Sequence, residues 1–346
     1  MKVLHLLQSN RFSGAENVVC QIIGMMKNEP DLQMAYCSRD GQISEALNER
    51  GIEFYPINNL TVSEVKRVIK EYKPDIIHAH DMRASYIAAR ACGKNITLIS
   101  HVHNNNFDSR GLSVKSIAYI LAAMKAKHIF WVSQSAYSGY AFHELFRKKS
   151  SILYNIIDID ELYRKMNTDK NMYDYDVIYV GRLTYPKDPQ RLMRVFKAIV
   201  EHLPNVKIAV VGTGDLEDEA KTLCREYRIQ SNVEFLGYQN NPLKMMHDSK
   251  VMIMTSRWEG TPMCVLEAMA LGVPVVSTPT DGVKYVVEDG KTGYLSDDDA
   301  VLVDRCLKIL KDNDLYQRMH QNSLKRAAEI LDSKTYKAAL DKVYRL

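Results

Sequence analysis

The sequence predicts an α/β protein built from two Rossmann-like, doubly wound domains. Short apolar runs rich in β-branched residues alternate with longer amphipathic segments, which is the pattern of βα units around a parallel sheet. The alternation pauses over residues 155–174 and then begins again. A length of 346 residues also exceeds what a single hydrophobic core usually requires. We therefore expect two domains of similar architecture.

The first series of apolar runs predicts a Rossmann-like domain over residues 1–154. Each run is four to seven residues long, which suits a strand buried in a parallel sheet, and helical patterns fill the intervals. The expected strands are Val3–Leu7, Leu32–Cys37, Ile52–Tyr55, Ile76–His80, Thr97–His103, Ile129–Val132 and Ser151–Tyr154.

A polar, acidic segment at residues 155–174 predicts an interdomain linker, because it contains no run that suits a strand. A second series of βα patterns follows and predicts another Rossmann-like domain over residues 175–295. Its expected strands are Val177–Val180, Lys207–Val211, Val233–Leu236, Val251–Met254 and Val273–Ser277.

Residues 296–346 contain only helical patterns. We expect helices at Asp298–Lys311, Leu315–Ile330 and Lys334–Tyr344, because their apolar residues recur at helical spacing. The last of these helices could pack back onto the amino-terminal domain.

Composition indicates a globular protein of the cytoplasm. Hydrophobic residues make up 46% and charged residues 25%, which is enough to form two cores without disulfides. The six cysteines are far apart in sequence and form no close pair typical of zinc or redox sites. The first apolar run is too short for a signal peptide, and no run approaches the roughly 20 residues of a membrane span.

The net charge of +4 lies in the first part of the chain. Residues 1–160 hold 19 Lys and Arg against 15 Asp and Glu, whereas residues 161–346 hold 27 of each. An excess this small and scattered does not suit nucleic acid, but it favours an anionic membrane surface. The segments 110–127 and 142–149 combine apolar and basic residues, so they either pack in the core or lie on a membrane. We predict peripheral contact with the inner face of the plasma membrane.

The loop Ser9–Glu16 follows the first expected strand and opens a helix. Gly14 would allow backbone N–H groups at the start of that helix to approach an anion. A glycine at such a turn is also common without any ligand. Gly14 is therefore a candidate anion-binding residue, and an ordinary turn glycine is the alternative.

Two cations follow the first strand of the second domain. Arg182 and Lys187 lie in one loop, where Arg can bind a phosphate as a fork and Lys as a point charge. Together they could neutralise a diphosphate without a metal ion. The alternative is an ordinary solvated loop.

The segment Ser256–Val276 carries the strongest signal. Glu259 lies in a loop rich in glycine and proline, and Glu267 falls in the helix that this loop opens. Pro262 suits the first turn of that helix and Gly272 suits its end. The free N–H groups at such a helix start can bind a phosphate.

These motifs together resemble glycosyltransferase family 4. The likeness is carried by Arg182 and Lys187 and by the Glu259–Glu267 pair within Glu-Gly-Thr-Pro…Glu-Ala-Met-Ala-Leu-Gly-Val-Pro-Val-Val. Ser13-Gly14-Ala15-Glu16 resembles the family's Gly-Gly-x-Glu loop, and residues 152–158 resemble its Pro-Asn-Gly-Val-Asp interdomain segment. The resemblance spans nearly the whole chain and implies the GT-B fold, with two domains facing across a cleft.

The resemblance also implies an activity. We expect a retaining glycosyltransferase, of hexosyl or N-acetylhexosaminyl type, that moves a sugar from a nucleoside-diphosphate donor, a UDP-sugar, onto a glycan or lipid-linked acceptor in surface polysaccharide synthesis. The first domain would bind the acceptor and the second the donor. No metal ion or other cofactor is expected.

Site residues follow from the matched positions. Arg182 and Lys187 would grip the donor diphosphate, Glu267 would bind the ribose hydroxyls, and Glu259 would lie by the transferred sugar. His103 matches the family's histidine near the reacting centre. The remaining positions would contact the donor through loop backbone or beside the base, and they are Gly14, Phe235, Gly260, Thr261, Pro262 and Met263.

Three departures from the family pattern concern loop shape. Ser13 replaces the first glycine of the amino-terminal loop, and Ile156 replaces the usual glycine between the domains. Residues 280–285 lack the frequent Gly-Gly-x-x-Glu ending. None of these departures touches the diphosphate cations or the glutamate pair.

Other functions fit the same fold and stay open. A nucleotide-sugar epimerase would consume the donor without an acceptor, and a sugar phosphorylase would need phosphate. A non-catalytic partner subunit would keep the fold without turnover. Donor turnover by the purified chain would separate these readings.

Metal binding is a further alternative. His78 and His80, like His101 and His103, are two apart on expected strands, so each pair shares a face and could ligate zinc. The acidic runs at 158–160 and 297–299 resemble metal-binding aspartates, but the second precedes a helix, where acidic residues favour the positive end of the helix dipole. Our prediction is that the protein holds no metal.

Overall fold

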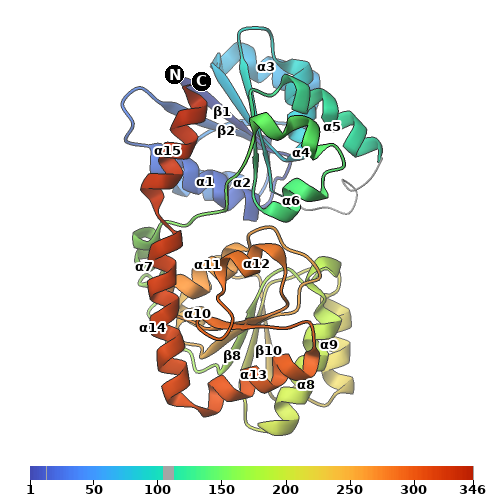
Figure 1. Cartoon of the computed structure of the whole chain (residues 1–346), viewed down its shortest axis with the longest axis vertical. Coiled ribbons are helices and arrows are strands. Elements are labelled where there is room, and N and C mark those ends of the chain that lie inside the picture. The colour runs from blue at the N-terminus through green and yellow to red at the C-terminus, as the bar shows by residue number, and fades with distance from the viewer. Residues whose placement is uncertain (13, 104–112, 346) are drawn as a thin grey trace. The chain divides into compact units, whose positions relative to one another are not determined.

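The computed structural model describes residues 1–12, 14–103 and 113–345 and divides the chain into two compact units (Figure 1). Unit 1 comprises Met1–Ile156 and Ser333–Leu346, and unit 2 comprises Ile157–Asp332. Ser13 of the first loop and residues 110–112 of the basic apolar segment lie outside the described residues.

Unit 1 contains a parallel seven-stranded sheet in the order β3-β2-β1-β4-β5-β6-β7. Its strands are β1 (Lys2–Leu6), β2 (Gln33–Arg39), β3 (Glu53–Ile57), β4 (Ile76–His80), β5 (Thr97–Val102), β6 (His128–Trp131) and β7 (Ser150–Ile152). Its helices are α1 (Gly14–Met26), α2 (Ile43–Glu49), α3 (Val62–Tyr72), α4 (Asp81–Ala91), α5 (Val114–Lys125), α6 (Gln134–Gly139), the 3₁₀ helix η2 (His143–Lys149) and α15 (Ser333–Tyr344).

Alternate residues of the central strands of unit 1 face opposite sides of the sheet. Leu4, Leu6 and Ile77 lie in the larger hydrophobic core. His5 and His78, which are partners in the parallel register of β1 and β4, alternate with them and lie on the other face. A strand that is buried on both faces therefore carries leucine on one side and histidine on the other.

Unit 2 contains a parallel six-stranded sheet in the order β10-β9-β8-β11-β12-β13. Its strands are β8 (Val177–Val180), β9 (Ile208–Val211), β10 (Val233–Gly237), β11 (Val251–Met254), β12 (Val275–Ser277) and β13 (Gly293–Leu295). Its helices are α7 (Ile159–Met166), the 3₁₀ helix η3 (Tyr185–Lys187), α8 (Pro189–His202), α9 (Glu217–Glu226), α10 (Leu243–His247), α11 (Met263–Ala270), α12 (Asp281–Val286), α13 (Asp299–Lys311) and α14 (Asn313–Ile330).

Local sequence explains where several helices begin. The hydroxyls of Thr61 and Ser113 accept N–H groups in the first turns of α3 and α5. Asp188 does the same for α8, and Pro189 occupies the first position of that helix, where a missing N–H costs nothing. The prediction of two doubly wound parallel sheets is confirmed, and most strand ends shift by one or two residues.

One strand, β13, was not predicted from the sequence. β13 is only three residues long and begins with a glycine, so it gives too little pattern to recognise. It pairs with β12, and a Cβ on Gly293 would lie 2.0 Å from the carbonyl oxygen of Val275. The glycine that weakens the sequence signal is therefore required for the close approach of the two backbones.

The segment interpreted as a linker, residues 155–174, contains helix α7 and belongs to unit 2 from Ile157 onward. Asp158 caps α7 by accepting the N–H of Glu161 at 3.0 Å. Tyr163 donates a hydrogen bond to the carbonyl of Ala270 at 3.0 Å, which anchors α7 against the end of α11. The acidic residues of this segment favour a helix start rather than an unstructured connection.

Helix α15 returns to unit 1 after the whole of unit 2 has been traversed. It packs on α1, and Lys337 pairs at 3.2 Å with Glu29, which follows α1. The Tyr344 hydroxyl lies 2.8 Å from Nδ1 of His78, so α15 also covers the histidine-bearing face of the sheet. No helix in the described part of the chain is long and apolar enough to span a bilayer.

Candidate functional site

The charged residues expected to bind the donor meet at the carboxyl ends of β8 and β11 in unit 2. Lys187 is the last residue of η3, and its ammonium group donates a hydrogen bond to Oε1 of Glu259 in the loop after β11. Both side chains are largely buried, with 14% of Lys187 and 9% of Glu259 exposed. The ion pair places a cation and a carboxylate from distant parts of the sequence side by side.

Neighbouring hydroxyls hold this pair in position. Ser256 donates a hydrogen bond to the same Glu259 oxygen at 2.7 Å. The Thr255 hydroxyl bonds the carbonyl oxygens of Lys187 at 3.3 Å and Asp188 at 3.2 Å. The end of β11 thus fixes both the carboxylate and the backbone that carries the lysine.

Arg182 lies in the same loop as Lys187 but is exposed. The Tyr179 hydroxyl donates to its carbonyl oxygen at 3.0 Å, which holds the backbone. Among the described residues, no side chain pairs with its guanidinium group. Arg182 therefore presents a cation that an anionic ligand could engage.

The turn after β9 supports the loop that carries Arg182. A Cβ on Gly212 would lie 2.0 Å from the carbonyl oxygen of Gly181, and a Cβ on Gly214 would lie 2.1 Å from that of Leu183. Gly212 also has a φ of +128°, which disfavours any other residue. The Gly-x-Gly pattern here serves close packing of two loops.

The start of α11 offers unused backbone donors. Pro262 is the N-cap, and no side chain caps the helix. The N–H groups of Val265 and Leu266 bond to the Pro262 carbonyl at 3.1 and 3.3 Å. Within the described part of the chain, no other residue accepts a hydrogen bond from the N–H groups of Met263 and Cys264. These two donors sit at the positive end of the helix dipole.

The loop Gly260–Thr261 before this helix is packed from one side by α12. A Cβ on Gly282 would lie only 1.2 Å from the carbonyl oxygen of Gly260. Any larger residue at 282 would displace this loop. The departure from the family pattern at residues 280–285 therefore still includes the small residue that the loop requires.

Glu267 lies on α11, one to two turns beyond the free donors. Its side chain is partly buried, and the surrounding protein atoms desolvate the carboxyl group and raise its pKa to about 7, with Lys165 on α7 opposing the shift. No described residue donates a hydrogen bond to this carboxylate. A buried acceptor without a donor is suited to receive ligand hydroxyls.

Phe235 is placed less directly. It lies in β10, the edge strand, with its ring partly buried against the core of unit 2 and the Lys221 ammonium 5.7 Å from the ring centre. Gly237, at the end of the same strand, adjoins the turn at Gly212. Its carbonyl accepts the Gly212 N–H at 2.7 Å. The role of Phe235 beside a base stays a prediction.

Gly14 and His103 belong to unit 1. Gly14 is the first residue of α1, is exposed, and would place an added Cβ in open space. His103 follows β5 and is buried, and its backbone N–H donates to Oδ1 of Asp81 at 2.9 Å. Burial lowers the pKa of His103 to about 3, so the imidazole is neutral at physiological pH.

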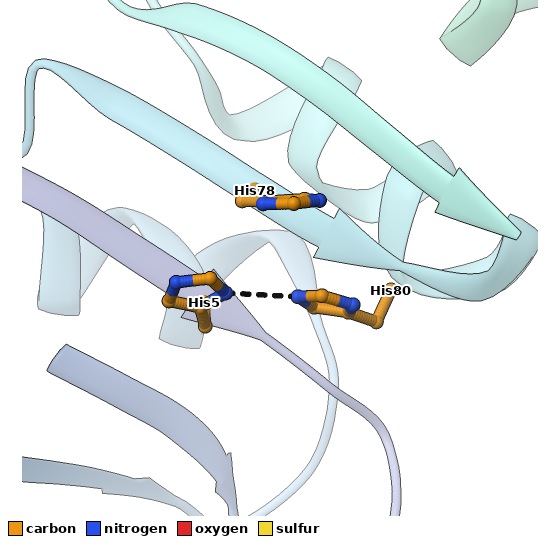
Figure 2. Close-up of side chains that lie close together, drawn as sticks. All are labelled: His5, His78 and His80. Carbon is orange, nitrogen blue, oxygen red and sulfur yellow. Dashed lines mark hydrogen bonds between the residues drawn. The ribbon is translucent and has the colours of Figure 1, made fainter. Parts of the chain in front are cut away.

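His103 is the end of a chain of hydrogen-bonded histidines. Figure 2 shows the hydrogen bond between His5 and His80. Nδ1 of His5 lies 2.9 Å from Nε2 of His80, and Nδ1 of His80 lies 2.8 Å from Nε2 of His103. His78 and His101 stack beside this chain, with ring centres 5.4 Å apart. Burial lowers the pKa of all five imidazoles, so each can donate one hydrogen bond and accept another.

The nitrogens of these histidines are close enough to raise the question of metal binding. The sets His5, His78, His80 and His80, His101, His103 each bring three nitrogens within 4.8 Å of one another. A ligated ion lies in the plane of each imidazole ring. The rings of His78 and His80 instead stack 4.5 Å apart at an angle of 22°, so they would have to turn before both could face one ion. As they lie, the rings suit hydrogen bonding rather than coordination.

The acidic runs considered as metal ligands act as helix caps in this structure. Asp298 accepts the N–H groups of Ala300 and Val301 at the start of α13, at 2.8 and 3.4 Å. Asp158 caps α7 in the same way. The metal reading of these two runs is not supported by their geometry.

Sequence reasoning missed three contributors to the site in unit 2. Ser256 lies in the quoted motif, but its bond to Glu259 depends on loop geometry. Lys165 was assigned to a linker and acts on Glu267 from α7. Gly282 was noted only as a departure, and its packing against Gly260 could not be seen in one sequence.

Comparison with known proteins identifies the family. Residues 163–326 match the model of glycosyl transferases group 1, and residues 13–161 match that of Glycosyltransferase Family 4. An N-acetyl-alpha-D-glucosaminyl L-malate synthase of Bacillus anthracis is 25% identical over 315 residues, covering 86% of this chain and 82% of the relative. A UDP-Gal:alpha-D-GlcNAc-diphosphoundecaprenol alpha-1,3-galactosyltransferase of Escherichia coli is 24% identical over 328 residues, covering 85% and 84%.

Solved structures agree on the fold. HepE of Anabaena, determined in complex with UDP-glucose, superposes with a TM-score of 0.86 at 21% identity, covering 100% of this chain and 99% of that one. The GT-B architecture expected from the sequence is therefore confirmed. With two doubly wound sheets and two family models that together extend from residue 13 to residue 326, the chain belongs to glycosyltransferase family 4.

Proposed function

We propose that this glycosyltransferase uses a UDP-sugar, transfers a hexosyl or N-acetylhexosaminyl group with retention of configuration, and needs no divalent metal. The observation that carries the proposal is the buried Lys187–Glu259 pair beside the exposed Arg182 and the unused N–H groups of Met263 and Cys264. Each of these groups suits a different part of a nucleotide-sugar.

The cations and the helix start suit the diphosphate. Negative charge grows on the leaving diphosphate as the bond to the sugar breaks, so donors aimed at it stabilise the transition state more than the ground state. Lys187 is held by Glu259 before any ligand arrives, which limits the reorganisation required. In many enzymes a divalent cation supplies this charge. Here Arg182, Lys187 and the start of α11 would supply it.

Glu259 and Glu267 suit hydroxyl groups. Glu259 is fixed by Ser256 and Lys187 at the loop that precedes α11, where a sugar bound through the diphosphate would lie. Glu267 has no protein donor, and a ribose offers two adjacent hydroxyls that could satisfy its carboxylate. A nucleoside diphosphate sugar would thus donate hydrogen bonds to both carboxylates.

The relatives support the donor and acceptor classes. The Anabaena neighbour was solved with UDP and with UDP-glucose, and the E. coli relative is named for UDP-Gal and a diphosphoundecaprenol acceptor. The B. anthracis relative is named for N-acetylglucosamine and malate. We propose a glycan or lipid-linked acceptor in surface polysaccharide synthesis, reached at the inner face of the plasma membrane.

Donor turnover by the purified chain tests the proposal. We expect UDP, and not GDP or ADP, to raise the melting temperature, because a ligand that binds only the native state stabilises it. Mass spectrometry of reactions with a panel of UDP-sugars and lipid-linked acceptors should detect transfer that excess EDTA does not abolish. Proton NMR of fresh product should show the donor's anomeric configuration.

Each part of the proposal can fail separately. Loss of activity with EDTA would overturn metal independence, and an inverted linkage would overturn retention. Conversion of the donor without acceptor would indicate an epimerase. Binding of UDP without any turnover would indicate a non-catalytic subunit.

A further inference from the structure

Helix α5 of unit 1 exposes a row of large apolar side chains. Val114 is 85% exposed, Ile117 51%, Leu121 55% and Met124 64%. Their spacing of three, four and three residues places them on one face of the helix. Of ten exposed large hydrophobic residues in the described part of the chain, four lie on this single helix of 12 residues.

The opposite face of α5 already forms part of the core. Ser116, Tyr119, Ala122 and Ala123 are buried there, and the helix packs against α4. Small residues allow that close packing, so α5 needs no further apolar surface to fold. The exposed row, which we call the α5 face, is therefore surplus to the stability of unit 1.

A fifth exposed apolar side chain lies in η2, the element that adjoins the end of α5. Leu145, in η2, is 72% exposed. Lys149, at the end of η2, donates hydrogen bonds to the carbonyls of Met124 at 2.9 Å and Ala126 at 2.7 Å. These bonds tie η2, and with it Leu145, to the carboxyl end of α5.

The charge around the α5 face is mainly positive, although the exposed Glu144 of η2 is acidic. Lys127, Arg147 and Lys148 are exposed, and within the described part of the chain no acidic side chain forms an ion pair with any of them. Residues 113–143 contain no Asp or Glu at all. An apolar stripe bordered by cations is the composition of a helix that lies in the interface of an anionic bilayer.

We infer that the α5 face docks on an anionic lipid surface, with Ile117 and Leu121 entering the acyl boundary and Lys127, Arg147 and Lys148 contacting lipid headgroups. A second copy of the chain is the weaker occupant, because a two-fold contact would bring the same unpaired cations against each other. The inference does not depend on sugar transfer, although such docking would bring the enzyme to a lipid-linked acceptor.

Vesicle flotation of the full chain tests the inference. The wild-type protein should float with vesicles of phosphatidylcholine and phosphatidylglycerol at low salt, much less at high salt, and not with phosphatidylcholine alone. Ile117→Gln/Leu121→Gln should lower the partition coefficient at least about tenfold, because two apolar side chains no longer enter the bilayer. Lys127→Gln/Lys148→Gln should lower it by about tenfold as well.

Met172→Gln is the matched control, since Met172 is 92% exposed in unit 2, away from the α5 face in sequence. Circular dichroism should show that all variants are folded, because the substituted side chains are exposed. The inference is overturned if the wild type does not float with anionic vesicles, if the Ile117/Leu121 variant floats as well as the wild type, or if neutral vesicles bind equally. It is also overturned if light scattering shows a dimer that the double variant abolishes.

Discussion

The two units share one scaffold but build different electrostatic environments on it, uncharged in unit 1 and charged in unit 2. When the strands of each unit are numbered separately, both sheets share the order third, second, first, fourth, fifth, sixth, and the sheet of unit 1 adds a seventh strand at its edge. Around β1, β4 and β5, unit 1 gathers five buried imidazoles that burial keeps neutral. After β8 and β11, unit 2 gathers Lys187, Glu259 and the exposed Arg182.

This difference shows what a doubly wound sheet determines and what it leaves open. The carboxyl ends of parallel strands supply a place for polar groups, and the loops decide whether that place is charged. Unit 1 can offer hydrogen bonds from uncharged rings. Unit 2 can offer positive charge that would stabilise the growing negative charge of a leaving diphosphate.

The largest expected difference between the units is their response to acid. The pKa values of His5 and His103 are lowered from 6.5 to about 3 by burial, so between these values the unfolded chain binds more protons than the folded chain. Their contribution to stability is complete above pH 6.5 and is lost as the pH falls. At pH 5 these two groups alone should reduce the free energy of unfolding by about 4 kcal/mol.

The two tryptophans allow each unit to be followed separately, because Trp131 lies in unit 1 and Trp258 in unit 2. Acid titration of Trp258→Phe should show unfolding of unit 1 at a higher pH than Trp131→Phe shows for unit 2. His101→Leu should move the unit 1 midpoint to lower pH, whereas exposed His202→Gln should not. Equal midpoints for both units would contradict the neutral-histidine account.

Loss of the buried cation should produce the next largest effect. Lys187→Met should lower turnover by roughly 10²–10³-fold, or about 3–4 kcal/mol, by analogy with removal of one preorganised donor. Because Lys187 is only 14% exposed, the variant also leaves the Glu259 carboxylate without its cation and should be less stable.

A second substitution separates these two consequences. Lys187→Met/Glu259→Gln should recover stability in thermal unfolding but not activity, since no charge then stays buried. Lys197→Met on the surface of α8, where Lys197 pairs with Glu201 at 3.3 Å, is the matched control and should retain activity. Turnover of folded Lys187→Met near the wild-type rate would mean that the phosphate site has been misassigned.

Glu267 should give a smaller and pH-dependent effect. Glu267→Ala should weaken UDP binding by about 1–3 kcal/mol, because ribose hydroxyls lose their acceptor. With its pKa raised to about 7, the carboxyl group accepts fewer hydrogen bonds as the pH falls through 7, so the affinity of the wild type for UDP should decrease. Calorimetry should show that Glu267→Gln loses this component. An unchanged affinity in Glu267→Ala would remove Glu267 from the donor site.

The smallest expected effect concerns the hydroxyl that positions Glu259. Ser256→Ala removes the 2.7 Å hydrogen bond to Oε1 but leaves Lys187 in place. We expect a loss of about 0.5–1.5 kcal/mol in kcat/KM, and Ser256→Thr should restore part of it. A loss as large as that of Lys187→Met would indicate that Ser256 contacts the substrate itself.

The sequence predicted most of the fold because parallel strands buried on both faces leave an uninterrupted apolar run, as in Val177–Val180. It failed at β13, where three residues and a required glycine leave no run to detect. It also predicted a linker at residues 155–174 because the segment is acidic. Acidic residues at a helix start are, however, part of the reason why α7 forms.

The residues of the candidate site could be predicted from the sequence, but the contacts between them could not. Arg182, Lys187 and Glu259 could be chosen from motif and loop position, because each lies beside glycine or proline after a strand, and Glu267 could be chosen from its place in the motif, in the helix that the Glu259 loop opens. The contact between Lys187 and Glu259 spans 72 residues and depends on β8 and β11 being neighbours in the sheet. The histidine chain likewise depends on the register of β1, β4 and β5, which the spacing of His78 and His80 alone does not reveal.

Helix α15 has a consequence for how the protein is made. Unit 1 is assembled from Met1–Ile156 and Ser333–Leu346, whereas unit 2 is one continuous stretch. During synthesis the ribosome must therefore deliver all of unit 2 before the helix that covers His78 and packs on α1 is available. Until then the Tyr344 hydroxyl that lies against His78 is missing, and unit 1 lacks the helix that completes it.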